Sequence, residues 1–105
     1  MPVLRAAALS AAGKLAAAEG RHRASAELVE RGLAIYRQLG EPDAVAKAVG
    51  RLAGSWYMAG DVERSEDLLR TSEIEARETG NRRLLAALLR HQAALTAEAE
   101  DPQRA

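Results

Sequence analysis

Glycine recurs every twenty residues along this 105-residue chain, and that regular punctuation strongly limits the folds open to it. Gly20, Gly40, Gly60 and Gly80 are each followed by a polar or charged residue, which is typical of a turn. The five segments that these glycines separate have the length of ordinary helices. The chain is therefore expected to fold as a series of similar elements joined by short turns.

Within the segments, apolar residues recur at intervals of three and four, which predicts helices rather than strands. Alanine supplies 24 of the 105 residues and leucine 14, and both residues have high helix propensity. Pro42 fits the first turn of one helix, and Asp61 is a suitable N-cap for the next. The expected fold class is all-α, with five helices.

Composition and charge argue against several classes of protein. Lys+Arg 15 balance Asp+Glu 15, so the chain lacks the excess of positive charge that favours direct binding of nucleic acid. The absence of Cys excludes disulfides and thiolate metal sites, and the two His residues lack the spacing of a metal-binding pair. Charged residues interrupt each apolar stretch before it reaches the length of a membrane span.

The sequence also lacks the motifs of common enzyme classes, namely a nucleophile elbow, a phosphate loop and a dinucleotide fingerprint. We therefore expect no enzyme activity, no cofactor and no metal. The apolar run after Met1 is interrupted by Lys14, so we expect a helix there rather than a secretion signal. The expected localisation is cytoplasmic.

A shift of the sequence by forty residues places small residues on small residues. Gly13 falls on Ala53, Ser25 on Ser65, and Gly32 on Ser72. Two antiparallel helices approach to about 8 Å only where the side chains at their crossing are small. The pattern predicts one domain over residues 1–105, with a first repeat over about 3–40, a second over about 41–80 and a half repeat over 81–100.

These motifs resemble those of the tetratricopeptide repeat (TPR) family. The resemblance rests on Leu52-Ala53 followed by Trp56, on the turn Gly60-Asp61, and on the small and aliphatic pattern of Ser65, Leu69 and Ser72. The period of forty exceeds the family's period of about thirty-four, and the usual terminating proline is absent. The chain looks most like the longer repeats found in bacterial signalling ATPases and in LuxR-type or antibiotic-pathway transcription regulators.

The resemblance implies a right-handed α-solenoid of antiparallel helix pairs that acts as a protein–protein interaction scaffold. It also implies a regulatory or sensory role within a bacterial transcription regulator or signalling protein. The Lys and Asn clamp with which some family members hold the terminal carboxylate of chaperone tails is not expected here, because the single Asn, Asn81, lies in a turn. Trp56 occupies the position of a packing aromatic, and we expect it in the core.

In such a stack the first helices of successive pairs line a concave groove. Arg51 and His91 are equivalent under the forty-residue shift and are expected side by side. A basic groove suits an acidic protein or peptide, whereas the alternative interpretation is a solvated face of an Arg-rich helix. The predicted groove residues are Lys14, Lys47, Arg51, Tyr57, Arg90, His91 and Glu98.

The last segment is too apolar to be a simple polar cap. Three explanations remain open: the chain is a piece of a longer solenoid, its last helix pairs with a second copy, or that helix folds over as an imperfect cap. The first two are favoured. A homodimer through the last helix would use Leu84, Leu88 and Leu95, and the alternative function is then a freestanding structural module that self-associates.

Overall fold

The computed structural model describes the backbone of residues 1–100 and the side chains of residues 1–94. Residues 1–100 form five helices and contain no strand, as the sequence predicts. The helices are α1 (Pro2–Ala18), α2 (His22–Leu39), α3 (Pro42–Met58), α4 (Val62–Thr79) and α5 (Arg82–Glu100). Among these helices, none has the combination of length and apolar character that crossing a membrane requires.

The helix boundaries follow from local chemistry. Each of the four turn glycines has a positive φ, between 66° and 86°, a conformation that costs glycine little and ends a helix cleanly. Pro42 lies in the first turn of α3, and the Asp61 side chain accepts a hydrogen bond from the backbone N–H of Arg64 at 3.2 Å. The predicted N-terminal signals of α3 and α4 are therefore confirmed.

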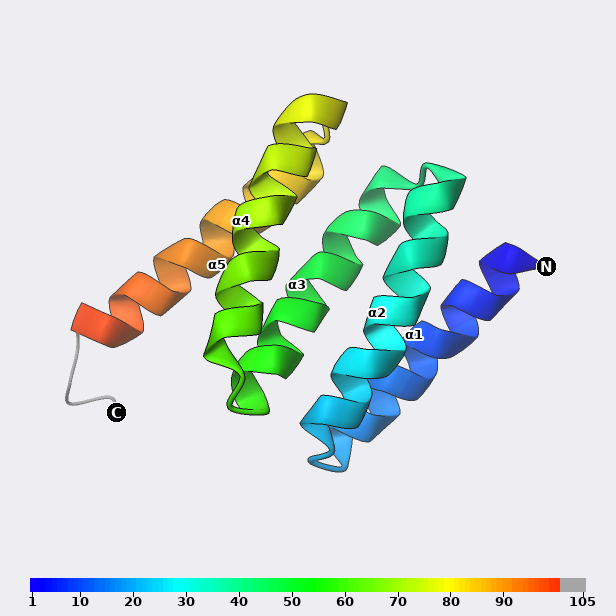
Figure 1. Ribbon diagram of the computed structural model, residues 1–105, viewed down its shortest axis with the longest axis horizontal. Helices are drawn as coiled ribbons and strands as arrows, with labels where there is room; N and C mark the ends of the chain where they lie inside the picture. Colours follow the sequence, from blue (N-terminus) through cyan, green and yellow to red (C-terminus); the bar gives the residue numbers. More distant parts are fainter. Residues whose placement is uncertain (101–105) are drawn as a thin grey trace.

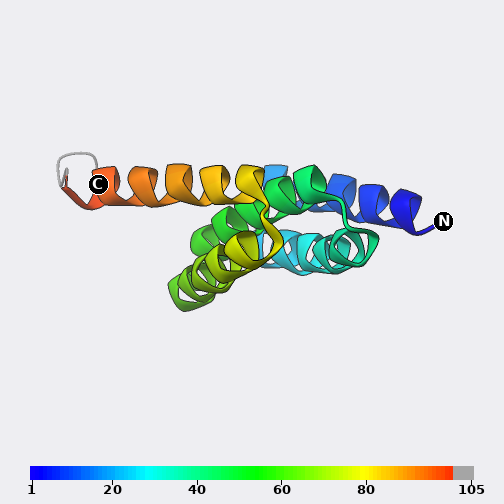
Figure 2. The same cartoon turned by 90° about the horizontal axis from the view of Figure 1, so that it is seen from above.

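Successive helices run in opposite directions and lie side by side along the molecule (Figure 1). Seen from above, α1, α3 and α5 lie on one side, and α2 and α4 lie on the other (Figure 2). Helix α3 is central, because it packs against α2, α4 and α5.

Within each antiparallel pair, α1–α2 and α3–α4, the two helices contact each other through small residues at equivalent positions. A Cβ added at Gly13 would lie 3.4 Å from the carbonyl oxygen of Ser25 and only 2.7 Å from a methyl of Val29. Forty residues later, the Ser65 hydroxyl donates a hydrogen bond of 2.9 Å to the carbonyl oxygen of Ala53. The positions that the sequence pairs by its forty-residue shift thus make the same helix contact in both pairs.

A single hydrophobic cluster joins α2, α3, α4 and α5. Trp56 lies in this cluster and is only 2% exposed, which confirms its predicted place in the core. The guanidinium of Arg64 lies 4.5 Å from the centre of the Trp56 ring, and that of Arg23 lies 5.6 Å away. These cations cover the indole and add a favourable interaction with its π-system.

The structure corrects the residues chosen for self-association through the last helix. Leu84 is fully buried and Leu88 is 2% exposed, because α5 packs against both α3 and α4 and uses these leucines for that contact. Among the side chains of α5 that the structure describes, those of residues 82–94, the exposed large apolar one is Leu89, at 57%. Leu95 lies outside the residues whose side chains are described.

Candidate partner-binding groove

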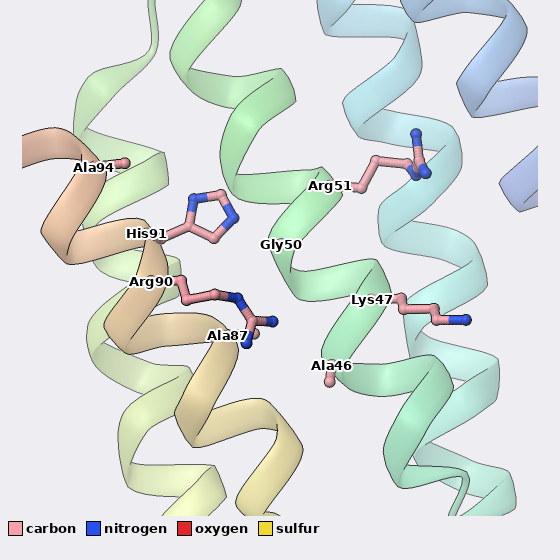
Figure 3. A pocket seen from close by; sticks show the side chains of 8 residues that line it. All are labelled: Ala46, Lys47, Gly50, Arg51, Ala87, Arg90, His91 and Ala94. Carbon is pink, nitrogen blue, oxygen red and sulfur yellow. The ribbon is translucent and has the colours of Figure 1, made fainter.

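A groove of about 500 Å³ lies between α3 and α5 (Figure 3). Its small lining residues are Ala and Gly, and its ionisable lining residues are Lys, Arg and His. Helix α3 contributes Ala46, Lys47, Gly50 and Arg51, and α5 contributes Ala87, Arg90, His91 and Ala94.

Helical periodicity places these residues on facing sides of the two helices. Ala87, Arg90, His91 and Ala94 are spaced by three and four residues, so that they share one face of α5. Figure 3 shows the Arg90 and His91 side chains projecting from this face toward α3. The α5 side of the groove therefore carries a guanidinium and an imidazole, with alanines beside them.

Gly50 explains how close the His91 ring comes to α3. A Cβ at position 50 would lie 3.2 Å from Nε2 of His91, so the imidazole packs against the bare backbone of α3. Gly50 was absent from the residues predicted to form the groove. The relevant signal is in the sequence, because a glycine inside a helix is unfavourable unless it permits a close approach.

A second groove, of about 370 Å³, lies on the other side of α3, between α3 and α1. Its floor includes Val29, and its basic side chains are Lys14 from α1 together with Lys47 and Arg51 from α3. The remaining lining residues include Ser10, Tyr36, Glu41 and Asp43. Because Lys47 and Arg51 line both grooves, the two grooves adjoin along α3.

The predicted proximity of Arg51 and His91 is only partly correct. Both residues line the α3–α5 groove, but Figure 3 shows the Arg51 and Lys47 side chains pointing away from α5. The imidazole occupies the space above Gly50, while Arg51 extends toward the α1 side of α3. The basic groups therefore form two adjoining sets rather than one patch.

The basic side chains are not neutralised within the part of the chain whose side chains are described. There, Lys14, Lys47, Arg51 and Arg90 make no ion pair, and the α3–α5 groove contains no acidic residue. In the α1–α3 groove, Asp43 already pairs with Arg83 at 2.9 Å. The α1–α3 groove also contains Glu41, but its three basic side chains outnumber this carboxylate, so both grooves favour a ligand that brings negative charge.

The other predicted groove residues lie elsewhere. Tyr57, near the end of α3, is 40% exposed and lines neither groove. Glu98 lies outside the residues whose side chains are described. Of the residues predicted for the groove, Lys14, Lys47, Arg51, Arg90 and His91 line one or both of the two grooves, and their role in binding stays a prediction.

Comparison of the chain with protein-family models, with curated proteins and with solved structures found no match. Among the described residues, no three His, Asp or Glu side chains are grouped so that they could hold a metal ion.

Proposed function

We propose that this protein is a TPR-like helical-repeat scaffold that binds an acidic segment of a protein partner along the two basic grooves. The observation that carries the proposal is the concentration of basic groups on the side formed by α1, α3 and α5, in a chain of zero net charge; within residues 1–94 these groups make no ion pair. A solvated helix face of a neutral protein usually mixes both signs of charge. Here the α3–α5 groove carries only one.

The repetition of contacts supports the TPR-like part of the proposal. Gly13 meets Ser25 in the first pair, and Ala53 meets Ser65 in the second, at positions forty residues apart. Such repetition is expected of an array in which each unit uses the same positions to hold its own two helices together. On this basis we propose the right-handed α-solenoid arrangement, with α5 as the first helix of a third unit.

The shape of the grooves indicates the kind of ligand. Small lining residues such as Ala46 and Ala87 leave room for a peptide beside α3 and α5, while Arg90 and His91 can reach its carboxylates. Lys47 and Arg51 then continue the basic surface toward Lys14. An extended or helical segment with acidic residues would contact both sets of basic groups.

The wider context of the proposal follows from the resemblance described above. A binding module of this kind fits the regulatory or sensory segment of a bacterial transcription regulator or signalling protein. The second candidate function is a freestanding module that self-associates, which is favoured by the exposed apolar face of α1 described below.

The groove proposal is tested by titrating the labelled chain with a glutamate-rich peptide and following backbone amide shifts. We expect shifts centred on Gly50, Arg51 and His91, because these residues line the grooves. The double variant Arg51→Glu/Arg90→Glu should weaken binding by about tenfold or more, since two attractive contacts become repulsive. Added salt should weaken binding of the wild-type chain.

A matched control has the same change in net charge on a different surface. Arg70→Glu/Arg77→Glu alters two exposed arginines of α4, and it should leave the affinity close to that of the wild type. A lysine-rich peptide of equal length should not bind. Equal weakening by both double variants, or amide shifts centred on α4, would contradict a specific groove.

A further inference from the structure

Helix α1 exposes an apolar seam on the side that faces away from α2. The seam consists of Leu4, Ala8, Ala11 and Leu15, all of which are exposed, with Leu4 at 63% and Leu15 at 62%. The opposite side of the helix, with Ala6, Gly13 and Ala16, is buried. Large apolar side chains thus lie at the centre of the exposed face, where a solvated helix usually carries polar ones.

Comparison with α3 shows what α1 lacks. At the positions forty residues after Ala7 and Ala11, α3 carries Lys47 and Arg51, which line the basic grooves. Helix α1 is instead apolar nearly all round, with Arg5 and Lys14 at the edges of its exposed face. Helices that are apolar all round are normally covered by protein, and an exposed apolar patch marks an interaction surface.

The order of residues in the seam indicates what covers it. The spacing from Leu4 to Ala8, Ala11 and Leu15 is four, three and four, and it reads the same in both directions. Two antiparallel copies of α1 related by a two-fold axis therefore bring Leu4 opposite the second copy's Leu15, and Ala8 opposite the second copy's Ala11. The central alanines allow the helices to approach closely, and the outer leucines pack at both ends.

The charges at the edges are compatible with this register. Arg5 and Lys14 lie on opposite edges of the seam. A two-fold axis keeps each edge beside its own equivalent, so that Arg5 lies beside the second copy's Ala12, and Lys14 beside the second copy's Ala7. The pairing thus brings no like charges into opposition.

We propose that the chain forms a symmetric homodimer through antiparallel pairing of α1 with α1 of a second copy. The dimer needs no ligand in the grooves, because its leucines lie outside both grooves, although Lys14 lies at the edge of the seam as well as in the α1–α3 groove. It replaces the buried leucines of α5 with Leu4 and Leu15 as the residues of self-association.

The first test is sedimentation equilibrium over a concentration series. The wild-type chain should reach twice the mass of one chain, whereas Leu4→Glu and Leu15→Glu should remain at a single mass. Both positions are exposed within one copy, so the variants should keep the helical circular dichroism of the wild type. Leu89→Glu, at an exposed leucine of α5, is the matched control and should still dimerise.

The second test uses the absence of Cys from the chain, which makes introduced thiols unique. An Ala8→Cys chain mixed with an Ala11→Cys chain should form the mixed disulfide in preference to either symmetric one, because a disulfide needs Cβ atoms about 3.5–4.5 Å apart. A wild-type chain that stays monomeric, a Leu4→Glu chain that still dimerises, or a preference for the symmetric disulfides would each overturn the proposal. A monomer would leave the seam to a helix of a different protein.

Discussion

Individual small residues decide how closely the helices of each pair approach. A Cβ at Gly32 would lie 3.3 Å from the carbonyl oxygen of Ala6, so this glycine brings α2 against the backbone of α1. Its equivalent forty residues later, Ser72, is fully buried, and its hydroxyl is the buried side-chain group without a hydrogen-bond partner among the described residues. Volume, rather than hydrogen bonding, therefore explains a small residue at these positions.

Gly32→Leu and Ser72→Leu should each lower the free energy of unfolding by about 1–3 kcal/mol, because the added carbons have no space at the helix crossing. Gly54→Ala is the matched control inside α3, where a Cβ would meet nothing within 4 Å. It should raise stability by about 0.5–1 kcal/mol through higher helix propensity. Urea denaturation measures all three, and unchanged stability of both leucine variants would place the crossings elsewhere.

At individual positions, the sequence pattern predicted the size of a side chain better than the direction in which the side chain points. The forty-residue shift identified Gly13, Ser25, Ala53 and Ser65 as contact positions, because close helix packing requires small side chains wherever it occurs. It did not predict that His91 turns toward α3 while Arg51 turns away. Side-chain direction depends on space left by neighbours, in this case above Gly50, which one helix alone does not determine.

At the scale of elements, Asn81 joins two turns that lie far apart in the sequence. Its side-chain oxygen accepts a hydrogen bond from the backbone N–H of Leu84 at 3.0 Å and so caps α5. Its side-chain nitrogen donates to the carbonyl oxygen of Pro42, at the start of α3, at 3.1 Å. The same end of the molecule carries a two-bond ion pair between Arg37 of α2 and Glu75 of α4, with bonds of 2.8 and 3.0 Å.

Asn81→Ala should lower the free energy of unfolding by about 1–2 kcal/mol, because it removes both the helix cap and the link to α3. Asn81→Asp keeps the capping oxygen but replaces the donor to the Pro42 carbonyl with a second carboxylate oxygen; because the cap remains, its loss should be smaller. Chemical denaturation compares the two variants. An aspartate variant as unstable as the alanine variant would show that the link, rather than the cap, dominates.

The elements themselves were predictable from sequence, whereas the use that α5 makes of its leucines was not. Turn glycines and the capping residue Asp61 act over a few positions, so they mark helix ends directly. Leu84 and Leu88 were expected at an exposed face, because one unpartnered helix at the end of a series suggested a free surface. Helix α5 instead contacts both α3 and α4, which consumes that surface.

At the scale of the whole molecule, the equal spacing of the turn glycines predicted the helices, whereas the net charge did not predict how charge is distributed over the surface. The spacing predicted five similar helices, and one contact within each antiparallel pair recurs at equivalent positions. Zero net charge argued against a strongly basic surface, yet the fold gathers basic residues along α1, α3 and α5 while α4 is rich in Asp and Glu. The net charge of a chain does not show whether basic and acidic residues lie on different sides of the molecule, because that depends on how the helices are layered.

The four turn glycines mark positions at which the backbone accepts an amino acid of the D configuration. At each of them φ is positive, so the backbone suits a D-amino acid, whose preferred φ has that sign. A synthetic chain with D-alanine at Gly60 should gain about 0.4–1 kcal/mol, because the unfolded chain loses freedom, whereas L-alanine there should lose about 1 kcal/mol. Thermal melting distinguishes the two stereoisomers, and identical melting temperatures would contradict the assigned turn geometry. A chain of L-amino acids would thus accept a D-amino acid at each turn between its helices.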